Sequence, residues 1–131
     1  MPKPEHVLQA VEGKEGLLEN ASPGMVWIDT STTDFKQSQE LEKKALTNNV
    51  SMLEATLTGG VHALQNNNMV SLAGGNKEIF NKWKELIQDA IGEVVVLCGD
   101  IGAGAIAKVV SNMLAFTLSL IHISEPTRRY F

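Results

Sequence analysis

The residues best suited to catalysis lie in one glycine-rich segment late in the chain. Gly99, Gly102, Gly104, Lys108 and Asn112 form the pattern GxxGxGxxxKxxxN. If a helix begins at Gly102, the four-residue steps place Gly104, Lys108 and Asn112 in a narrow stripe on successive turns. An ammonium and an amide then point the same way, beside a first turn without side chains that leaves room for a substrate. An ammonium near a developing alkoxide stabilises it and can transfer a proton to it.

Two other interpretations of this segment stay open. Lys108 could be a solvated surface lysine and Asn112 a packing polar residue, as on most helices. Gly102, Gly104 and Ala107 also satisfy the loose dinucleotide fingerprint GxGxxA, although a helix start packed close to a strand gives the same pattern. The fingerprint needs an acidic residue on a second strand about twenty positions on, which here falls at the end of the chain.

Apolar patterning predicts the elements that must position these residues. The sheet is α/β with mainly parallel strands, because strands alternate with helices. About eleven residues separate the second and third strands, which is short for a parallel crossover and allows one antiparallel pairing. The last strand is uninterrupted and β-branched, as expected when both faces are covered. The predicted strands are 25–29, 51–57, 69–73 and 93–97. The predicted helices are 4–12, 35–48 with Asp34 as its cap, 77–91 with Asn76 as its cap, and one from 102 onward.

The helix after Asn76 has the clearest pattern. Its apolar residues fall at helical spacing and form one stripe, which predicts a buried face. We expect Trp83 to belong to the core rather than to a ligand site. The stripe consists of Ile79, Phe80, Trp83, Leu86, Ile87 and Ala90.

Composition excludes several classes of protein. The 131 residues are 44% hydrophobic and 20% charged, typical of one ordinary globular domain rather than a collagen or a disordered chain. The net charge of −4 argues against nucleic acid as a partner. The one cysteine, Cys98, excludes a disulfide scaffold and suggests a reducing, cytoplasmic location. We expect no membrane partner, because the apolar run from Met113 to Ile123 contains polar residues and is short, and the first residues lack the apolar core of a signal peptide.

The end of the chain differs from what precedes it. Residues 118–128, LSLIHISEPTR, include Pro126 and an arginine pair with neither caps nor matching periodicity. This string resembles a translated adapter from a sequencing library, so we predict that 118–131 is a non-native tail. His122, Glu125, Arg128 and Arg129 would then have no function. The alternative is a natural helix end.

The chain resembles the β-hydroxyacid dehydrogenase family, which includes 3-hydroxyisobutyrate dehydrogenase and tartronate semialdehyde reductase. The likeness extends from Met1 to about Thr117 through blocks in family order and spacing. These are the helix VLQAVEGKEGLL, residues 29–32 (family DxST), 54–60 (family DAPVSGG), 73–75 (family VGG) and GxxGxGxxxKxxxN.

The resemblance implies an α/β fold: the C-terminal part of a Rossmann-type nucleotide-binding domain (1–101) running into the start of a long interdomain helix (102–117). It implies hydride transfer between NAD or NADP and a small 3-hydroxy acid in a homo-oligomeric parent enzyme, with no metal. Glyoxylate, tartronate or succinic semialdehyde reduction, or a non-catalytic nucleotide-binding remnant, are the alternatives. By the same likeness Lys108 is catalytic and Asn112 orients the substrate. Thr58, Gly59 and Gly60 hold the substrate carboxylate, and Pro2 and Thr32 contact the dinucleotide.

The chain also departs from the family pattern. Thr58 replaces a serine, and Thr56 replaces a proline, which should loosen the loop. Residues 61–68 replace small residues; His62 invites a catalytic role, but a polar loop residue is the expected alternative. The opening strand with GxGxxG and the closing helical domain have no counterpart, so we expect Met1 not to be the native start and the chain alone to be inactive.

Overall fold

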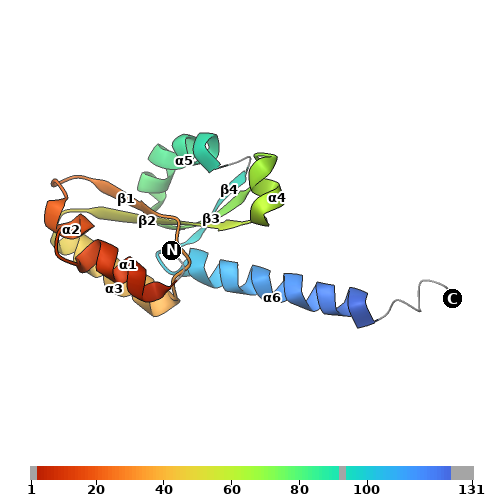
Figure 1. The fold of residues 1–131 in the computed structure, drawn as a ribbon. Coiled ribbons are helices and arrows are strands. Elements are labelled where there is room, and N and C mark those ends of the chain that lie inside the picture. The colour runs from red at the N-terminus through yellow and green to blue at the C-terminus, as the bar shows by residue number, and fades with distance from the viewer. Residues whose placement is uncertain (1–2, 92–93, 125–131) are drawn as a thin grey trace.

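The computed structural model describes residues 3–91 and 94–124, which form one four-stranded sheet with helices on both faces (Figure 1). The strand order is β1-β2-β3-β4, with β1/β2 and β3/β4 parallel and β2/β3 antiparallel. The α/β prediction and its one antiparallel pairing are therefore confirmed. The elements are α1 (Pro4–Glu12), α2 (Leu17–Asn20), β1 (Val26–Asp29), α3 (Phe35–Thr47), β2 (Ser51–Thr58), α4 (Gly60–Gln65), β3 (Val70–Gly75), α5 (Lys77–Ile91), β4 (Val94–Gly99) and α6 (Ala103–Ser124).

The helix predicted over residues 4–12 is confirmed as α1, whereas two other expectations about helices are wrong. The family block VLQAVEGKEGLL is not one helix, because α1 ends at Glu12 and α2 begins only at Leu17. Glycines at 13 and 16 flank this break and favour the turn. Residues 60–65, expected as a loop, form the short helix α4 between β2 and β3.

Each face of the sheet has its own apolar core, because side chains alternate along β2. On one face Met52 packs with α1 and α3, and on the other Leu53 and Ala55 pack with α5. The first cluster consists of Val7, Val11, Trp27, Leu41, Ala45, Val50, Met52 and Ile101, and the second of Leu53, Ala55, Ala73, Phe80, Ile87 and Val95.

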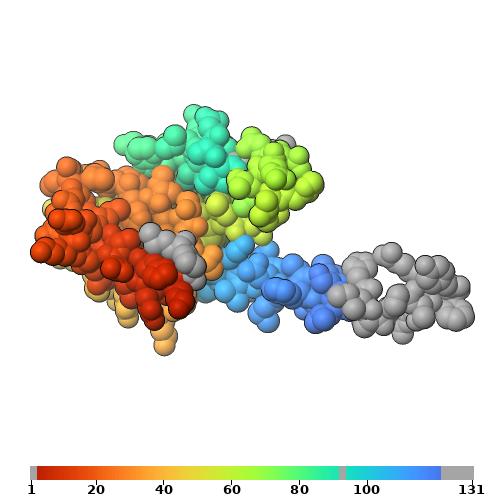
Figure 2. All heavy atoms as spheres, viewed as in Figure 1, coloured from red at the N-terminus to blue at the C-terminus, as the bar shows by residue number. Residues whose placement is uncertain are grey.

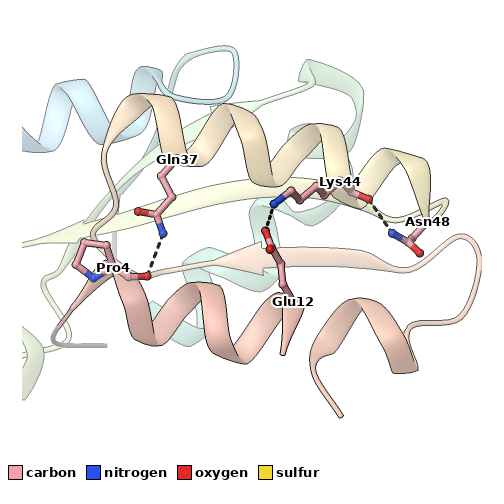
Figure 3. A network of polar contacts seen from close by, with 5 residues as sticks. All are labelled: Pro4, Glu12, Gln37, Lys44 and Asn48. Atoms are coloured by element: carbon pink, nitrogen blue, oxygen red, sulfur yellow. Dashed lines mark hydrogen bonds and ion pairs between the residues drawn. The ribbon is translucent and has the colours of Figure 1, made fainter. Parts of the chain in front are cut away.

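Polar contacts tie α1 to α3 across the first core (Figure 3). Gln37 Nε2 donates to the carbonyl of Pro4 at 3.0 Å, and Lys44 forms an ion pair with Glu12. Asp34 caps α3 by accepting from the Gln37 backbone N–H at 2.7 Å, as the sequence predicts. These contacts hold α1 and α3 together on one face of the sheet, over β1 and β2.

The predictions for β4 and α5 need correction. β4 is an edge strand with one covered face: Val95 is buried against α5, whereas Val94 and Val96 are 43% and 44% exposed. Nothing in the described residues covers that second face fully. On α5, Phe80 and Ile87 are buried and Trp83 is partly buried, but Leu86 is 53% exposed. At about 100° per residue Leu86 lies at the edge of the stripe farthest from Phe80 and Ile87.

The helix α6 leaves the sheet and projects from the body of the molecule (Figures 1 and 2). It continues without a break through Leu118, where a non-native tail is predicted, to Ser124. The residues from Glu125 lie outside the description, and the origin of the tail stays a prediction. The segment Ala103–Ile121 has a mean hydropathy of 1.6 with 11% of it buried, so by length and composition it could cross a membrane. It is therefore longer than the expected run from Met113, although a helix covered by protein has the same properties.

We expect the isolated chain to self-associate through α6, because its outer turns expose a contiguous apolar surface. Val109 and Met113 are 52% and 64% exposed on this helix. Sedimentation velocity at micromolar concentration should show species larger than a monomer. The double variant Val109→Lys/Met113→Glu should shift the chain toward monomer. Leu46→Glu, at a 56% exposed position of α3, should not. A wild-type chain that is monomeric throughout would contradict the prediction.

Candidate functional site

The glycine-rich turn before α6 binds a carboxylate of the chain itself. Gly102 N–H and Gly104 N–H donate to Glu54 Oε1 at 2.8 and 2.7 Å. Since these amides would have to face the pyrophosphate in a GxGxxA site, the dinucleotide interpretation of this turn is wrong. The turn starts a helix packed close to a strand, as the alternative interpretation holds.

The same turn has no space for a substrate, contrary to expectation. A Cβ added at Gly104 would lie 2.7 Å from the carbonyl oxygen of Leu72, and one at Gly102 would lie 2.4 Å from Phe35 Cδ2. The glycines therefore allow close approach of the sheet and of α3. In the predicted stripe of Gly104, Lys108 and Asn112, Gly104 packs against the sheet, and the other two residues lie farther along the helix.

Glu54 is buried, with 2% of its surface exposed, and its Oε2 has no hydrogen-bond partner. Burial raises the pKa of the carboxyl group, and this outweighs the lowering by hydrogen bonds from the backbone of Gly104, Gly102 and Ala105 and by the nearby Ser38 hydroxyl. Ser38 makes its own hydrogen bond to Thr33, at 2.7 Å between the two oxygens. A carboxyl group is thus held at the helix N-terminus in a site that disfavours its charge.

This raised pKa predicts how stability depends on pH. The folded chain keeps the Glu54 proton to a higher pH than the unfolded chain, in which the pKa is about 4.3. The folded state therefore binds more protons in that window, and the contribution of Glu54 to the free energy of unfolding is lost as pH rises through the folded pKa.

In the wild type, the free energy of unfolding measured with urea should decline between about pH 4 and pH 8, and Glu54→Gln should remove part of that decline. Glu42, whose pKa is raised by burial and by Asp100, contributes the same decline to both proteins. The exposed Glu40→Gln serves as the control and should follow the wild type. If the free energy of unfolding of Glu54→Gln declines with pH as steeply as that of the wild type, the Glu54 carboxyl group is not the source of the decline.

The carboxyl end of β2 holds the predicted substrate loop. Thr58 ends the strand and is partly buried, while Gly59 and Gly60 are exposed and start α4. Both glycines have positive φ, 129° and 71°, and nothing lies within 4 Å of a Cβ added at Gly60. At Gly60 the backbone is open to a ligand, and glycine is needed for its conformation rather than for space. At Gly59 it is needed for both, because an added Cβ would lie 2.7 Å from the Ala63 Cβ.

The loop after β1 lies at the same end of the sheet, because β1 and β2 are parallel. Buried Asp29 accepts hydrogen bonds from the backbone and hydroxyl of Ser31, which order the start of the loop. Thr32 is exposed beyond it. In open α/β sheets ligands bind outside the carboxyl ends of parallel strands, so this edge suits a bound nucleotide. Pro2, the other predicted cofactor contact, lies outside the described residues.

A groove of about 790 Å³ separates α6 from the sheet and reaches Thr58. Its walls are mainly apolar, with Val70 and Leu72 on β3 and with Ala107 and Ser111 on α6. Lys108 and Asn112 lie on the second and third turns of α6, beside residues that form this wall, but neither of them lines the groove itself.

Lys108 is partly buried and Asn112 is exposed. Within the described part of the chain, the ammonium of Lys108 has no ion-pair partner. Gly104, one turn earlier, faces the sheet, so helical spacing places Lys108 toward the sheet as well and Asn112 one turn farther out. Lys108 and Asn112 therefore lie on the turns of α6 that follow its contact with the sheet, and Thr58, Gly59 and Gly60 lie where β2 ends.

His62, weighed above as a possible catalytic residue, is exposed on α4 and its ring nitrogen lies 3.2 Å from Asn66 Nδ2. The groove is not lined by it. Cys98 does line the groove, but partial burial and the Glu54 carboxylate raise the pKa of its thiol, so it is a poor nucleophile. No cluster of metal-binding side chains occurs within the ranges that the structure describes.

The residue that sequence reasoning missed is Glu54. It matched the first position of the DAPVSGG block, but no role was assigned to it. The available signal was its type: it is the only charged residue of the otherwise apolar and neutral strand β2, SMLEATLT. A single carboxylate in a buried strand needs a partner inside the protein.

Comparisons with known proteins agree with this geometry. Residues 1–99 match the model of the NAD-binding domain of 6-phosphogluconate dehydrogenase. Human mitochondrial 3-hydroxyisobutyrate dehydrogenase is 33% identical over 125 residues, covering 95% of this chain. This chain spans only 37% of the length of that relative.

Solved structures give the same result. The 3-hydroxyisobutyrate dehydrogenase of Salmonella typhimurium superposes with a TM-score of 0.74 and 27% identity, over 85% of this chain and 38% of that protein. The enzyme of Mycobacterium tuberculosis, with L-serine, gives 0.70 and 26%, over 75% and 33%. These similarities confirm the resemblance to β-hydroxyacid dehydrogenases and the Rossmann-type fold. The chain therefore belongs to the family of NAD-binding domains found in 6-phosphogluconate dehydrogenase.

Proposed function

We propose that the chain is part of an NAD- or NADP-dependent dehydrogenase that oxidises a small 3-hydroxy acid, with Lys108 as its catalytic residue. The observation that carries this proposal is that Lys108 lies partly buried one turn after Gly104, on a helix packed against β2, the strand that ends in Thr58 and the exposed glycines. The human relative is a 3-hydroxyisobutyrate dehydrogenase. The Mycobacterium tuberculosis relative was solved with L-serine, which is itself a 3-hydroxy acid.

In this proposal, residues of α6 act on the 3-hydroxyl end of the substrate, and residues at the end of β2 bind its carboxylate. The amine of Lys108 takes the proton of the 3-hydroxyl group during oxidation, and the ammonium returns it to the alkoxide during reduction. Asn112, one turn on, orients the hydroxyl or the carboxylate by hydrogen bonds. The Thr58 hydroxyl and the backbone N–H groups of Gly59 and Gly60 bind the carboxylate.

The described residues fit the nicotinamide end of a dinucleotide. The open backbone at Gly60 and the exposed Thr32 loop lie at the edge where such cofactors bind, whereas the α6 turn is closed by Glu54. When bound, the nicotinamide supplies the acceptor or donor of the hydride. Thr32 and Pro2 would contact the dinucleotide, as the family resemblance implies.

The test begins with the source DNA, sequenced across both ends of this reading frame, followed by expression of the complete protein. The purified protein should reduce NAD or NADP when 3-hydroxyisobutyrate or L-serine is added, and the absorbance at 340 nm measures this reduction. Glyoxylate and succinic semialdehyde are assayed in the reverse direction, because the same site chemistry suits their reduction. A complete protein that binds the cofactor but turns over none of these substrates would leave only a nucleotide-binding role.

A further inference from the structure

One ionisable group near the site has no part in the proposed reaction, the buried carboxyl group of Glu54. We propose that Glu54 is a positioning residue: by capping α6 it fixes the helix that carries Lys108 against the end of β2. The inference rests on the proposed function, since it assigns Glu54 a role toward Lys108 in that same site.

The carboxylate lies in a socket whose walls are backbone. It accepts the N–H groups of Gly102 and Gly104 through one oxygen. A Cβ added at Gly74 would lie 2.2 Å from that oxygen, and one at Gly104 would lie 2.9 Å from it. The glycines of β3 and of the α6 turn therefore leave room for this carboxylate, so the strand and the helix cannot shift independently of it.

A second contact from the same strand supports the first. Thr56, two residues beyond Glu54 on the same face of β2, is 1% exposed, and its hydroxyl is placed to donate to the carbonyl oxygens of Leu72 at 2.9 Å and Gly104 at 3.2 Å. The expectation that Thr56 loosens a loop is wrong, because it lies inside β2. Glu54, Thr56 and Thr58 thus form one row that runs from the helix cap to the proposed carboxylate site.

The distance from this cap to Lys108 is short. Lys108 follows Gly104 by one helical turn, about 6 Å along the axis. Beyond that turn α6 is mostly exposed, so the cap and the Thr56 contact determine where the helix points. An error of about 1 Å in the placement of a catalytic group can cost a factor of about 10² in rate.

A matched pair of variants tests this role in the complete protein. Gln in place of Glu54 keeps the length and an oxygen that can accept both N–H groups, and its amide can donate to the Ser38 hydroxyl. Met keeps the length and the volume but accepts no strong hydrogen bond. We expect Glu54→Gln to keep kcat within about threefold of the wild type. Glu54→Met should lower kcat at least about tenfold, with KM and the Kd for the cofactor nearly unchanged.

Hydrogen exchange in the chain itself tests the cap without any activity. The Gly102 and Gly104 amides should exchange slowly in the wild type and in Glu54→Gln, and fast in Glu54→Met. If Glu54→Met does not fold, Glu54→Ala takes its place. Alanine offers no acceptor to either amide and adds no bulk, so exchange should quicken and kcat should fall.

The outcomes separate the two proposals. A wild-type kcat in Glu54→Met, or an equal loss in Glu54→Gln, overturns the positioning role. Slow exchange of both amides in Glu54→Met overturns the cap itself. A wild-type protein without turnover contradicts the proposed function, and the exchange data then decide the cap alone.

Discussion

Replacing Lys108 with alanine in the complete protein should lower kcat with a 3-hydroxy acid by a factor of about 10² to 10⁴. The variant loses the group that takes the hydroxyl proton and stabilises the alkoxide, whereas water in its place is neither charged nor held in position. The Kd for NAD should stay nearly unchanged, because Lys108 lies on α6, whereas the proposed dinucleotide contacts are Thr32, on the loop after β1, and Pro2. Steady-state kinetics and a fluorescence titration of the cofactor measure the two quantities.

Two further variants sharpen this experiment. Lys108→Arg keeps the positive charge but not the compact ammonium or the ability to give up a proton, so it should stay well below the wild type. Lys43→Ala removes an exposed lysine of α3 and should have no effect. An unaltered kcat in Lys108→Ala would remove Lys108 from the mechanism and favour a binding module.

The largest loss of stability is expected from Gly74→Ala. The added Cβ would lie 2.2 Å from Glu54 Oε1 and 2.8 Å from the carbonyl oxygen of Asp100. One of these is backbone and the other is a buried, hydrogen-bonded carboxylate, so neither can move away cheaply. We expect a loss of roughly 3 kcal/mol in the free energy of unfolding, measured by urea denaturation.

The control is Gly24→Ala, where nothing lies within 4 Å of the added Cβ but φ is +87°. It should cost only the conformational penalty, about 1 kcal/mol. In a double-mutant cycle with Glu54→Ala, the Gly74→Ala cost should fall below its value in the wild type, because one of the two clashing groups is gone. Equal costs in both backgrounds would show that Glu54 does not occupy the socket.

Much of the fold is predictable from the sequence, for local reasons. The apolar period places α3 and α5 within a residue or two of their observed ends, and the Asp34 and Asn76 caps are present as predicted. The short link between β2 and β3 correctly allows their antiparallel pairing. These features depend on residues near each other in the chain.

Other expectations failed because they depend on what packs against an element. The β-branched run of β4 is the same whether one face is covered or two, and only the strand order shows that it lies at an edge. The glycines of the α6 turn likewise look suited to a phosphate or a substrate. Their amides instead meet Glu54, which lies 48 residues before Gly102 and 50 before Gly104 in the chain.

The sequence by itself determined the order of the four strands and of the longer helices, the family resemblance and the residue types at Thr58, Gly59, Gly60, Lys108 and Asn112. Types and spacing are local properties. Only the tertiary structure decided which of these residues share an end of the sheet and that Glu54 caps the helix that carries Lys108. The physical reason is that a buried carboxylate needs hydrogen-bond donors, and these can come from residues far away in the sequence. Spacing along the sequence does not show which residues those are.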